Sequence, residues 1–314
     1  MPVKVGVIGV GHLGQHHARL FASMDGVQLI GVCDTNHPRA EEIASKFGTQ
    51  VVDAADLLSR VNAVTVAVPT IAHLEVAMPF LEAGVATLIE KPIAPSVEDA
   101  DRLVAAAERG GALLATGHTE RFNPAVAKAL PLIADPRFIE IHRLGTFPER
   151  SLDIDVIFDL MIHDLDLLLS VVKSPVTMIE AVGVNVLTPK ADIANARLRF
   201  ASGCIANVTA SRISRERVRK ARFFQHDSYV SIDYASQELE MFRLVKDSAT
   251  DGLMAAGRPI IHGGKLEVMN EEPLRRELED FVDAVRARRA PGVTGRDGRE
   301  ALALATRVAE TMES

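Results

Sequence analysis

Three glycines near the start of the chain have the spacing of a phosphate-binding turn. Gly9, Gly11 and Gly14 form the pattern G-x-G-x-x-G after an apolar run and at the start of a helical pattern. The first glycine permits a tight turn, the second lets the backbone approach a pyrophosphate, and the third lets helix and strand pack closely. Free amide groups at the helix N-terminus would hold the phosphate charge. This context favours a dinucleotide site, to which His12 and Leu13 contribute, over a glycine-rich turn without a ligand.

An acidic residue lies at the distance from this turn that a dinucleotide site requires. Asp34 follows the end of the second apolar run, twenty positions after Gly14. An aspartate there would accept hydrogen bonds from the adenosine ribose hydroxyls and would repel a 2′-phosphate. It therefore predicts NAD as the cofactor, although Arg39 nearby keeps NADP as the less favoured alternative.

A lysine between a glutamate and a proline ends another apolar run. Ligands of open α/β sheets bind outside the carboxyl ends of the strands, so Lys91 of Glu90-Lys91-Pro92 would face the cofactor. A buried ammonium group there would stabilise negative charge that develops on a substrate oxygen. Taken alone, a lysine at a strand end is more often a solvated surface residue.

A second polar cluster lies in an otherwise apolar helical segment. Helical spacing places Asp159, His163 and Asp166 on one stripe. An aspartate one turn before a histidine orients the ring, which makes His163 a candidate general base for a hydroxyl proton. From these residues alone a structural network is an equal alternative, and a zinc site is a weaker one because the sequence offers no further ligand. We therefore predict no metal.

The elements that must position these residues change character along the chain. Up to about residue 116, short continuous apolar runs alternate with helical patterns, which predicts a doubly wound parallel sheet covered on both faces. The strand runs are Val3–Val10, Val27–Cys33, Ala63–Val68, Ala86–Ile89 and Ala112–Thr116, and the helical patterns include Ala40–Phe47, Ala72–Ala83 and Val97–Arg109.

After about residue 120 the pattern becomes that of consecutive strands with short turns. Such a pattern predicts an antiparallel sheet, preceded by a helix over Ile157–Val171. We expect a loop over Lys246–Gly264 and two closing helices near Pro273–Arg288 and Arg296–Glu313. The predicted domains are residues 1–120, an α/β Rossmann domain, and residues 121–314, an α+β domain for substrate binding and oligomerisation. The strand runs of the second domain are Val176–Leu187, Ala194–Phe200, Ile205–Ser211, Arg219–Gln225, Tyr229–Tyr234 and Glu238–Val245.

Composition excludes several classes of partner. The 314 residues are 47% apolar and 25% charged, with a formal net charge of −7, two tyrosines and no tryptophan. An acidic chain with few aromatic residues is a poor candidate for nucleic acid or an anionic membrane. Two distant cysteines, no signal peptide and no long apolar stretch lead us to expect a cytoplasmic protein.

Four motifs in this order resemble the glucose-fructose oxidoreductase / inositol dehydrogenase / MocA family over nearly the whole chain. They are the glycine turn, Val68-Pro69-Thr70-x-x-His73, Glu90-Lys91-Pro92 and Gly117-His118-x-x-Arg121-Phe122-Asn123-Pro124. The resemblance implies a Rossmann domain followed by an α+β domain with an open, mostly antiparallel sheet. It implies that Lys91 is catalytic and that Asp159 and His163 belong to the active site, although Met161 stands where many members have glycine.

The resemblance completes the set of expected site residues. Cofactor contacts are expected from Gly9, Gly11, His12, Leu13, Gly14, Asp34, Val68, Pro69, Thr70, His73, Glu90 and Lys91. Substrate contacts are expected from Lys91, Arg121, Asn123, Asp159 and His163. The catalytic residues among these are Lys91, His163 and Asp159.

The nucleotide-sugar branch of the family is most similar around residues 117–124 and 159–166. That branch implies oxidation of a UDP-N-acetyl sugar at its 3-hydroxyl. Inositol, a free sugar and a small carbonyl compound remain alternatives, and a regulator that binds dinucleotide without catalysis is disfavoured because the catalytic residues are present. The basic stretch Ser211–Arg222 is a candidate diphosphate contact, but a turn or a subunit contact is favoured. For contact with substrate or nicotinamide, Thr146–Ser151 is a weaker candidate than Arg121 and Asn123. The open sheet predicts a homodimer or homotetramer.

Overall fold

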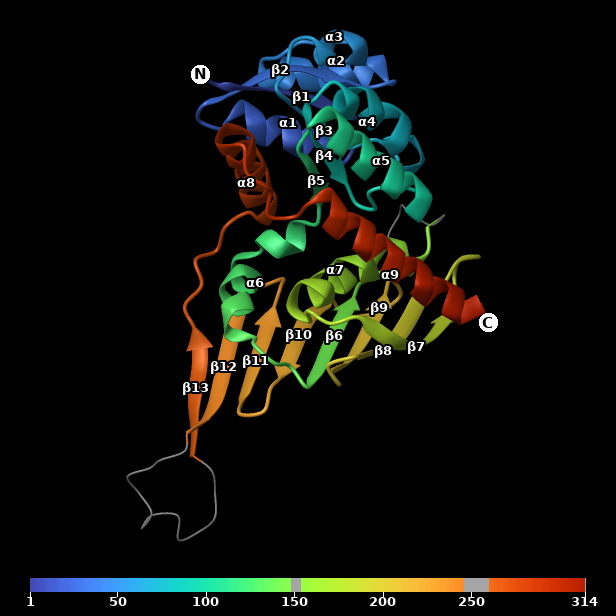
Figure 1. Ribbon diagram of the computed structural model, residues 1–314, viewed down its shortest axis with the longest axis vertical. Helices are drawn as coiled ribbons and strands as arrows, with labels where there is room; N and C mark the ends of the chain where they lie inside the picture. Colours follow the sequence, from blue (N-terminus) through green and yellow to red (C-terminus); the bar gives the residue numbers. More distant parts are fainter. Residues whose placement is uncertain (148–153, 246–259, 314) are drawn as a thin grey trace. The chain divides into compact units, whose positions relative to one another are not determined.

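The computed structural model describes residues 1–147, 154–245 and 260–313, which form two compact units (Figure 1). The first unit comprises Met1–Phe122 and Glu272–Ala303, and the second comprises Asn123–Glu271 and Leu304–Ser314. Each unit has its own sheet. No helix within the described ranges is both long enough and apolar enough to cross a membrane.

The sheet of the first unit is parallel, as its continuous apolar runs predict. Its strands lie in the order β2-β1-β3-β4-β5. A bridge between Val32 of β2 and Val51 adds a rudimentary strand outside β2, which produces the usual order of a dinucleotide-binding domain. The predicted α/β fold class is thereby confirmed. The strands are β1 (Val3–Ile8), β2 (Val27–Cys33), β3 (Ala63–Val66), β4 (Ala86–Glu90) and β5 (Leu114–Gly117).

Helices cover both faces of this sheet, and local signals set their ends. Asn36 accepts a hydrogen bond from the amide of Arg39 at the start of α2, and Gly48 ends that helix in the left-handed conformation. Ser96 and Gly111 do the same for α5. The helices are α1 (Gly14–Ala22), α2 (His37–Phe47), α3 (Ala54–Leu58), α4 (His73–Glu82) and α5 (Val97–Gly110).

The helix α8 (Pro273–Ala287) packs in the first unit, although the sequence assigns everything after residue 120 to the second domain. Leu278, Phe281 and Val282 are buried in the core cluster that also contains residues of β1 and α1. Figure 1 shows α8 beside α1. Burial of this apolar face returns the chain to the first unit, and α9 (Gly295–Glu313) then contributes to both units.

The second unit contains an eight-stranded sheet in the order β13-β12-β11-β10-β6-β9-β8-β7. All neighbouring pairs are antiparallel except β6 and β9, which are parallel, so the predicted mostly antiparallel α+β domain is confirmed. Its strands are β6 (Phe138–Leu144), β7 (Val176–Val184), β8 (Ile193–Phe200), β9 (Ile205–Ser211), β10 (Val218–Phe224), β11 (Ser228–Asp233), β12 (Glu238–Val245) and β13 (Ile260–Leu266).

Two of these strands differ from the prediction. The strand β6 was not expected, and β13 begins inside Lys246–Gly264, where the sequence predicts a loop. That loop prediction is wrong for residues 260–264, because Gly263 and Gly264 are accommodated in the ladder opposite Phe242 and Met241. Residues 246–259 lie outside the described part of the chain.

One face of the second sheet is covered by helices, and the other is exposed. On β8, Ala194, Ala196 and Leu198 are buried while the residues between them are exposed. The helices α6 (Pro124–Ala129) and α7 (Ile162–Val171) lie on the covered face (Figure 1). The opposite face is open and includes the exposed apolar side chains of Met178, Val182 and Val184.

Candidate active site

The glycine turn has the geometry that each glycine predicts. Gly9 has a φ of +83°, and a Cβ on it would lie 2.7 Å from the backbone of Ala67. A Cβ on Gly14 would lie 1.7 Å from the carbonyl oxygen of Gly9. A Cβ on Gly11, by contrast, would meet nothing within 4 Å. Packing within the chain therefore requires Gly9 and Gly14, whereas Gly11 leaves the backbone open to an outside group, which fits a pyrophosphate.

Leu13 and His12 lie on the outer side of the same turn. Leu13 is the residue that precedes α1, and its side chain is exposed. His12 is also exposed, and its ring lies edge-on to that of His16, with 5.9 Å between ring centroids. Both residues are thus accessible beside the open face of Gly11.

The carboxylate of Asp34 is fixed next to this turn by two backbone amides. Oδ2 accepts from the amide of Val10 at 2.7 Å, and Oδ1 accepts from the amide of Asn36 at 2.9 Å. The guanidinium of Arg39 is held by other acceptors, namely Val10 O at 3.1 Å, Gln15 Oε1 at 2.9 Å and Glu42 Oε2 at 2.7 Å. An anion at this position favours a ribose diol, and the engaged arginine is less suited to a 2′-phosphate.

Lys91 lies at the same edge of the sheet as the glycine turn. The strand β4 is buried through Glu90, and Lys91, which follows it, is half-buried and joined to Pro92 by a cis peptide bond. The segment of Val68, Pro69 and Thr70 follows the neighbouring strand β3. Since all five strands are parallel, their carboxyl ends bring these residues together with the glycine turn and Asp34.

Glu90 and His73 lie beneath this edge rather than on it. Glu90 Oε1 is 3.0 Å from Nε2 of the buried His17, and only 6% of Glu90 is exposed. The ring nitrogens of His73 lie 3.0 Å from the carbonyl oxygens of Pro92 and Val68, and burial lowers its pKa. Both residues hold the segments that carry Val68 and Lys91, and the direct cofactor contacts expected from them stay a prediction.

Arg121 and Asn123 are engaged inside their own units. Arg121 Nη2 lies 3.6 Å from Asp297 Oδ1, with 14% of the arginine side chain exposed. Asn123 is 2% exposed and begins α6, where Oδ1 accepts from the amide of Ala125 at 3.1 Å. Its Nδ2 donates to the carbonyl oxygen of Tyr234 at 3.0 Å. These contacts give Asn123 a structural role, and its contact with substrate stays a prediction.

The helical segment with Asp159 and His163 has an unexpected π-helical turn. This turn spans Ile157–Met161, directly before α7, and includes Asp159. Turns of this kind occur frequently at functional sites. Asp159 and His163 are partly exposed, whereas Asp166 is buried, so the predicted stripe is divided. Met161 is fully buried, so it packs in the interior of its unit.

The adjacent Asp164 anchors this helix to the sheet. Its Oδ2 accepts from Nε of Arg143 on β6 at 2.8 Å, and its Oδ1 accepts from Nη2 of the same arginine at 2.8 Å. Both side chains are almost fully buried. Arg143 was not singled out from the sequence. It follows Ile139 and Ile141 at every second position, and this spacing could have indicated a charged residue on the buried face of a strand.

The basic stretch is mostly paired within the second unit. Arg212 is buried against Asp192, with Nε 2.9 Å from Oδ1, and its Nη1 donates to the carbonyl oxygen of Ile154 at 2.7 Å. Further along, Arg222 pairs with Glu140 at 2.7 Å. These contacts favour the structural interpretation of Ser211–Arg222. In the weaker candidate Thr146–Ser151, residues 148–151 lie outside the described part of the chain.

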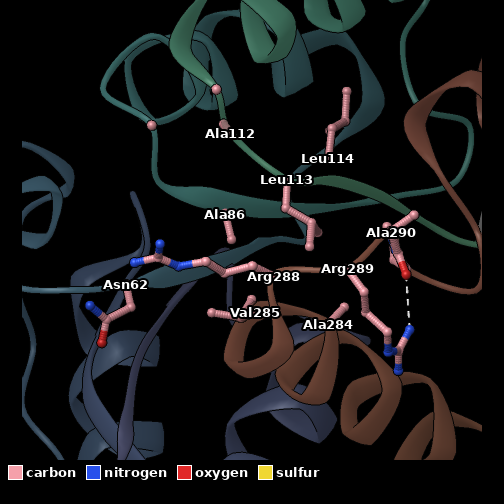
Figure 2. A pocket seen from close by; sticks show the side chains of 13 residues that line it. Asn62, Ala86, Ala112, Leu113, Leu114, Ala284, Val285, Arg288, Arg289 and Ala290 are labelled. Carbon is pink, nitrogen blue, oxygen red and sulfur yellow. Dashed lines mark hydrogen bonds between the residues drawn. The ribbon is translucent and has the colours of Figure 1, made fainter.

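A cavity of about 620 Å³ lies elsewhere, at the amino ends of the parallel strands (Figure 2). Asn62, Ala86 and Leu114 line it at the starts of β3, β4 and β5, and Arg288 and Arg289 line it from the end of α8. Because Rossmann ligands bind at the opposite edge, this cavity is not the candidate active site. Within the described ranges, no three His, Cys, Asp or Glu residues are grouped in a way that would hold a metal.

Comparison with known proteins gives consistent matches along the chain. Residues 3–118 match an oxidoreductase family with an NAD-binding Rossmann fold, and residues 97–224 match the GFO/IDH/MocA C-terminal domain. The chain is 39% identical over 314 residues to UDP-N-acetylglucosamine 3-dehydrogenase of Acidithiobacillus ferrooxidans, covering 99% of this chain and 98% of that enzyme. A solved structure of that enzyme aligns with a TM-score of 0.92 at 38% identity, covering 100% and 98% of the two chains.

Two more distant relatives have other substrates in their names. Inositol 2-dehydrogenase of Rhizobium meliloti is 28% identical over 97% of this chain and 95% of its own length. The structure of levoglucosan dehydrogenase in complex with NADH and L-sorbose aligns with a TM-score of 0.85 over 100% and 97% of the chains. At 19% identity, that likeness concerns the fold alone.

Proposed function

This chain belongs to the GFO/IDH/MocA family of oxidoreductases, and we propose that it is an NAD-dependent dehydrogenase that oxidises the 3-hydroxyl of a UDP-N-acetyl sugar. Its relatives are named dehydrogenases, so the chain is an enzyme that acts on CH–OH groups. The observation that carries the proposal is the location of Lys91 at the same strand edge as the glycine turn and Asp34. The identity of 39% over 99% of the chain supports the choice of substrate.

The first unit holds the cofactor in this proposal. The amides between Gly11 and the start of α1 bind the pyrophosphate, and Asp34 accepts hydrogen bonds from the adenosine ribose, which selects NAD over NADP. The nicotinamide, when bound, supplies hydride acceptance and donation. Val68, Pro69 and Thr70 form the segment next to it, and this is possible because Pro69 is exposed and the other two are partly exposed.

Three side chains handle the proton and the charge of the reacting alcohol. Oxidation removes a hydride from carbon and a proton from the hydroxyl oxygen. His163, oriented by Asp159, accepts that proton, and the ammonium group of Lys91 stabilises negative charge on the oxygen. The partial exposure of His163, Asp159 and Lys91 is consistent with access for a substrate.

The second unit also offers a surface for self-association. Met178, Val182 and Val184 are 50%, 57% and 48% exposed on the open face of β7. Exposed apolar patches of this kind are often covered by another subunit. We propose a homodimer or homotetramer, in which this face packs against a second copy.

The direct test is absorbance at the NADH band with a panel of UDP-sugars, free sugars and inositols. Reduction of NAD with UDP-N-acetylglucosamine and not with the free sugars supports the proposal. Inositol is the second candidate, since a full-length relative is an inositol 2-dehydrogenase. Activity on inositol alone would reject the nucleotide sugar and retain the dehydrogenase. Binding of NAD without turnover of any alcohol would favour a regulator.

A further inference from the structure

A buried histidine on the cofactor-binding helix contacts the residue just before the proposed catalytic lysine. His17 lies three positions after Gly14 on α1 and is fully buried. We propose that His17 is a positioning residue, which acts through Glu90 to fix Lys91, and that it thereby couples the helix of the glycine turn to the site of hydride transfer. This inference rests on the catalytic role proposed for Lys91.

The contacts form a continuous path from α1 to the lysine. His17 Nε2 lies 3.0 Å from Glu90 Oε1, and the amide of Lys91 donates to Glu90 Oε2 at 3.3 Å. The other ring nitrogen of His17, Nδ1, has no hydrogen-bond partner among the described residues. The hydrogen bond to Glu90 therefore depends on the proton on Nε2. A Cβ on Gly117 of β5 would lie 2.9 Å from Glu90 Oε2, so glycine is needed there to make room for the carboxylate.

The charge of Glu90 depends on this histidine. Burial raises the pKa of Glu90, but the hydrogen bond and charge of His17, together with Lys91, more than offset it, so the pKa lies below its usual value. The ionisable groups that act on Glu90 are His17 from α1, Lys91 beside it and His73 from α4. Without the His17 donor, burial favours the protonated acid, which no longer accepts from the Lys91 amide with full charge.

The other side of the lysine is held by a second buried histidine. His73 Nδ1 lies 3.0 Å from the carbonyl oxygen of Pro92, and its Nε2 lies 3.0 Å from that of Val68. Glu90 and Pro92 flank Lys91 in sequence, so buried imidazoles from two different helices contact both of its neighbours. A half-buried lysine whose two neighbours are both held in this way lies on a fixed segment of backbone.

Three variants test the role of His17. His17→Leu removes the donor, His17→Gln keeps an amide donor near the position of Nε2, and Leu20→Ala removes buried packing from the same helix without touching Glu90. We expect His17→Leu to lower kcat by about tenfold to 100-fold with little change in the dissociation constant of NAD, since small misplacements of a reacting group have effects of this size. His17→Gln should restore most of kcat, and Leu20→Ala should lose stability but keep kcat.

A second measurement uses the protein without cofactor. The free energy of unfolding of His17→Gln and His17→Leu is compared by urea denaturation from pH 8 to pH 5, and both variants lack the imidazole. In His17→Leu we expect the pKa of Glu90 in the folded protein to be raised, so that variant gains stability as pH falls. The difference in free energy of unfolding between His17→Gln and His17→Leu should therefore shrink toward pH 5. Adding Glu90→Gln to both should abolish this pH dependence.

The outcomes separate this inference from the proposed function. An unchanged kcat in His17→Leu, or a difference in stability that is independent of pH, would overturn the positioning role. Absence of wild-type turnover on every alcohol would reject the proposed function, and the unfolding measurement would still decide whether His17 keeps Glu90 ionised.

Discussion

Arg143 and Asp164 form a two-point ion pair in the interior of the second unit, with two nitrogen–oxygen distances of 2.8 Å. The arginine side chain is 4% exposed and the aspartate side chain 0%. The guanidinium also lies over the ring of Tyr234, 5.4 Å from its centroid. Asp164 directly follows His163, so this pair ties the proposed general base to β6.

Removal of either partner of this pair should destabilise the protein strongly. Arg143→Met or Asp164→Leu leaves a buried group without its partner, and we expect a loss of about 3–5 kcal/mol in the free energy of unfolding. Urea denaturation measures it. The double variant Arg143→Met/Asp164→Leu should lose less than the sum of two single variants, because no charge remains buried. Additive losses in this cycle would contradict a direct coupling.

Gly11 provides a test of cofactor binding that folding does not confound. A Cβ at Gly11 would contact nothing, whereas a Cβ at Gly14 would collide with Gly9. We therefore expect Gly11→Val to keep the wild-type melting temperature and to weaken NAD binding by about tenfold or more, since the side chain occupies the path of the pyrophosphate. Gly14→Ala should instead lose stability. Isothermal titration and thermal unfolding measure the two effects, and unchanged NAD affinity in Gly11→Val would place the pyrophosphate elsewhere.

The first sheet was predictable because its strands are continuous apolar runs, and the second was predictable only in part. On β6 the buried positions are Ile139, Ile141 and Arg143, so an internal ion pair breaks the apolar alternation that marks a strand. On β13, Gly263 and Gly264 read as a turn until the partner strand β12 is known. In both cases a tertiary contact overrides the local pattern.

The candidate site shows the same limit at the level of single side chains. Residue type and spacing were sufficient to find Lys91 and the glycine turn, because the carboxyl edge of a parallel sheet collects them. They did not reveal that Glu90 and His73 point inward, since direction at a strand end depends on which helix packs there. The contact of His17 with Glu90 spans 73 positions and has no counterpart in local sequence.

Asp34 should determine the preference for NAD. Asp34→Asn keeps a carbonyl acceptor for the amide of Val10 but removes the negative charge that would repel a 2′-phosphate. We expect the ratio of kcat/KM for NAD to that for NADP to fall on the order of tenfold, which corresponds to about 1.4 kcal/mol. Asp53→Asn, which alters an exposed carboxylate without a hydrogen bond to the helix it precedes, is the matched control. An unchanged ratio would remove Asp34 from the ribose site.

Asp192 should make the second unit sensitive to acid. Its Oδ2 accepts from the amides of Val186, Leu187 and Thr188, its Oδ1 pairs with Arg212, and its pKa is held well below the usual range. A folded pKa below the unfolded one means that this contribution to stability is complete above the unfolded pKa and is lost as pH falls through the folded pKa. Asp192→Asn should therefore be less stable than wild type at pH 7, with a difference that shrinks below about pH 4. Urea denaturation across this range checks the trend, and a constant difference would contradict it.

Lys91 and His163 should both be needed for the oxidation of the alcohol, and neither should be needed to bind the cofactor. Lys91→Met removes the cation that stabilises the developing alkoxide, and we expect kcat to fall by about 100-fold to 1,000-fold. His163→Gln removes the proton acceptor, and we expect a loss of about 100-fold or more. Both variants should keep the wild-type dissociation constant for NAD, because Asp34 and the glycine turn are unaltered. Lys4→Met, which alters an exposed lysine on β1 of the same sheet, should behave as wild type.

If Lys91 and His163 act in one transition state, the double variant should lose much less kcat than the product of the two single losses. Full multiplication of the two effects would instead mean that the lysine and the histidine serve separate steps.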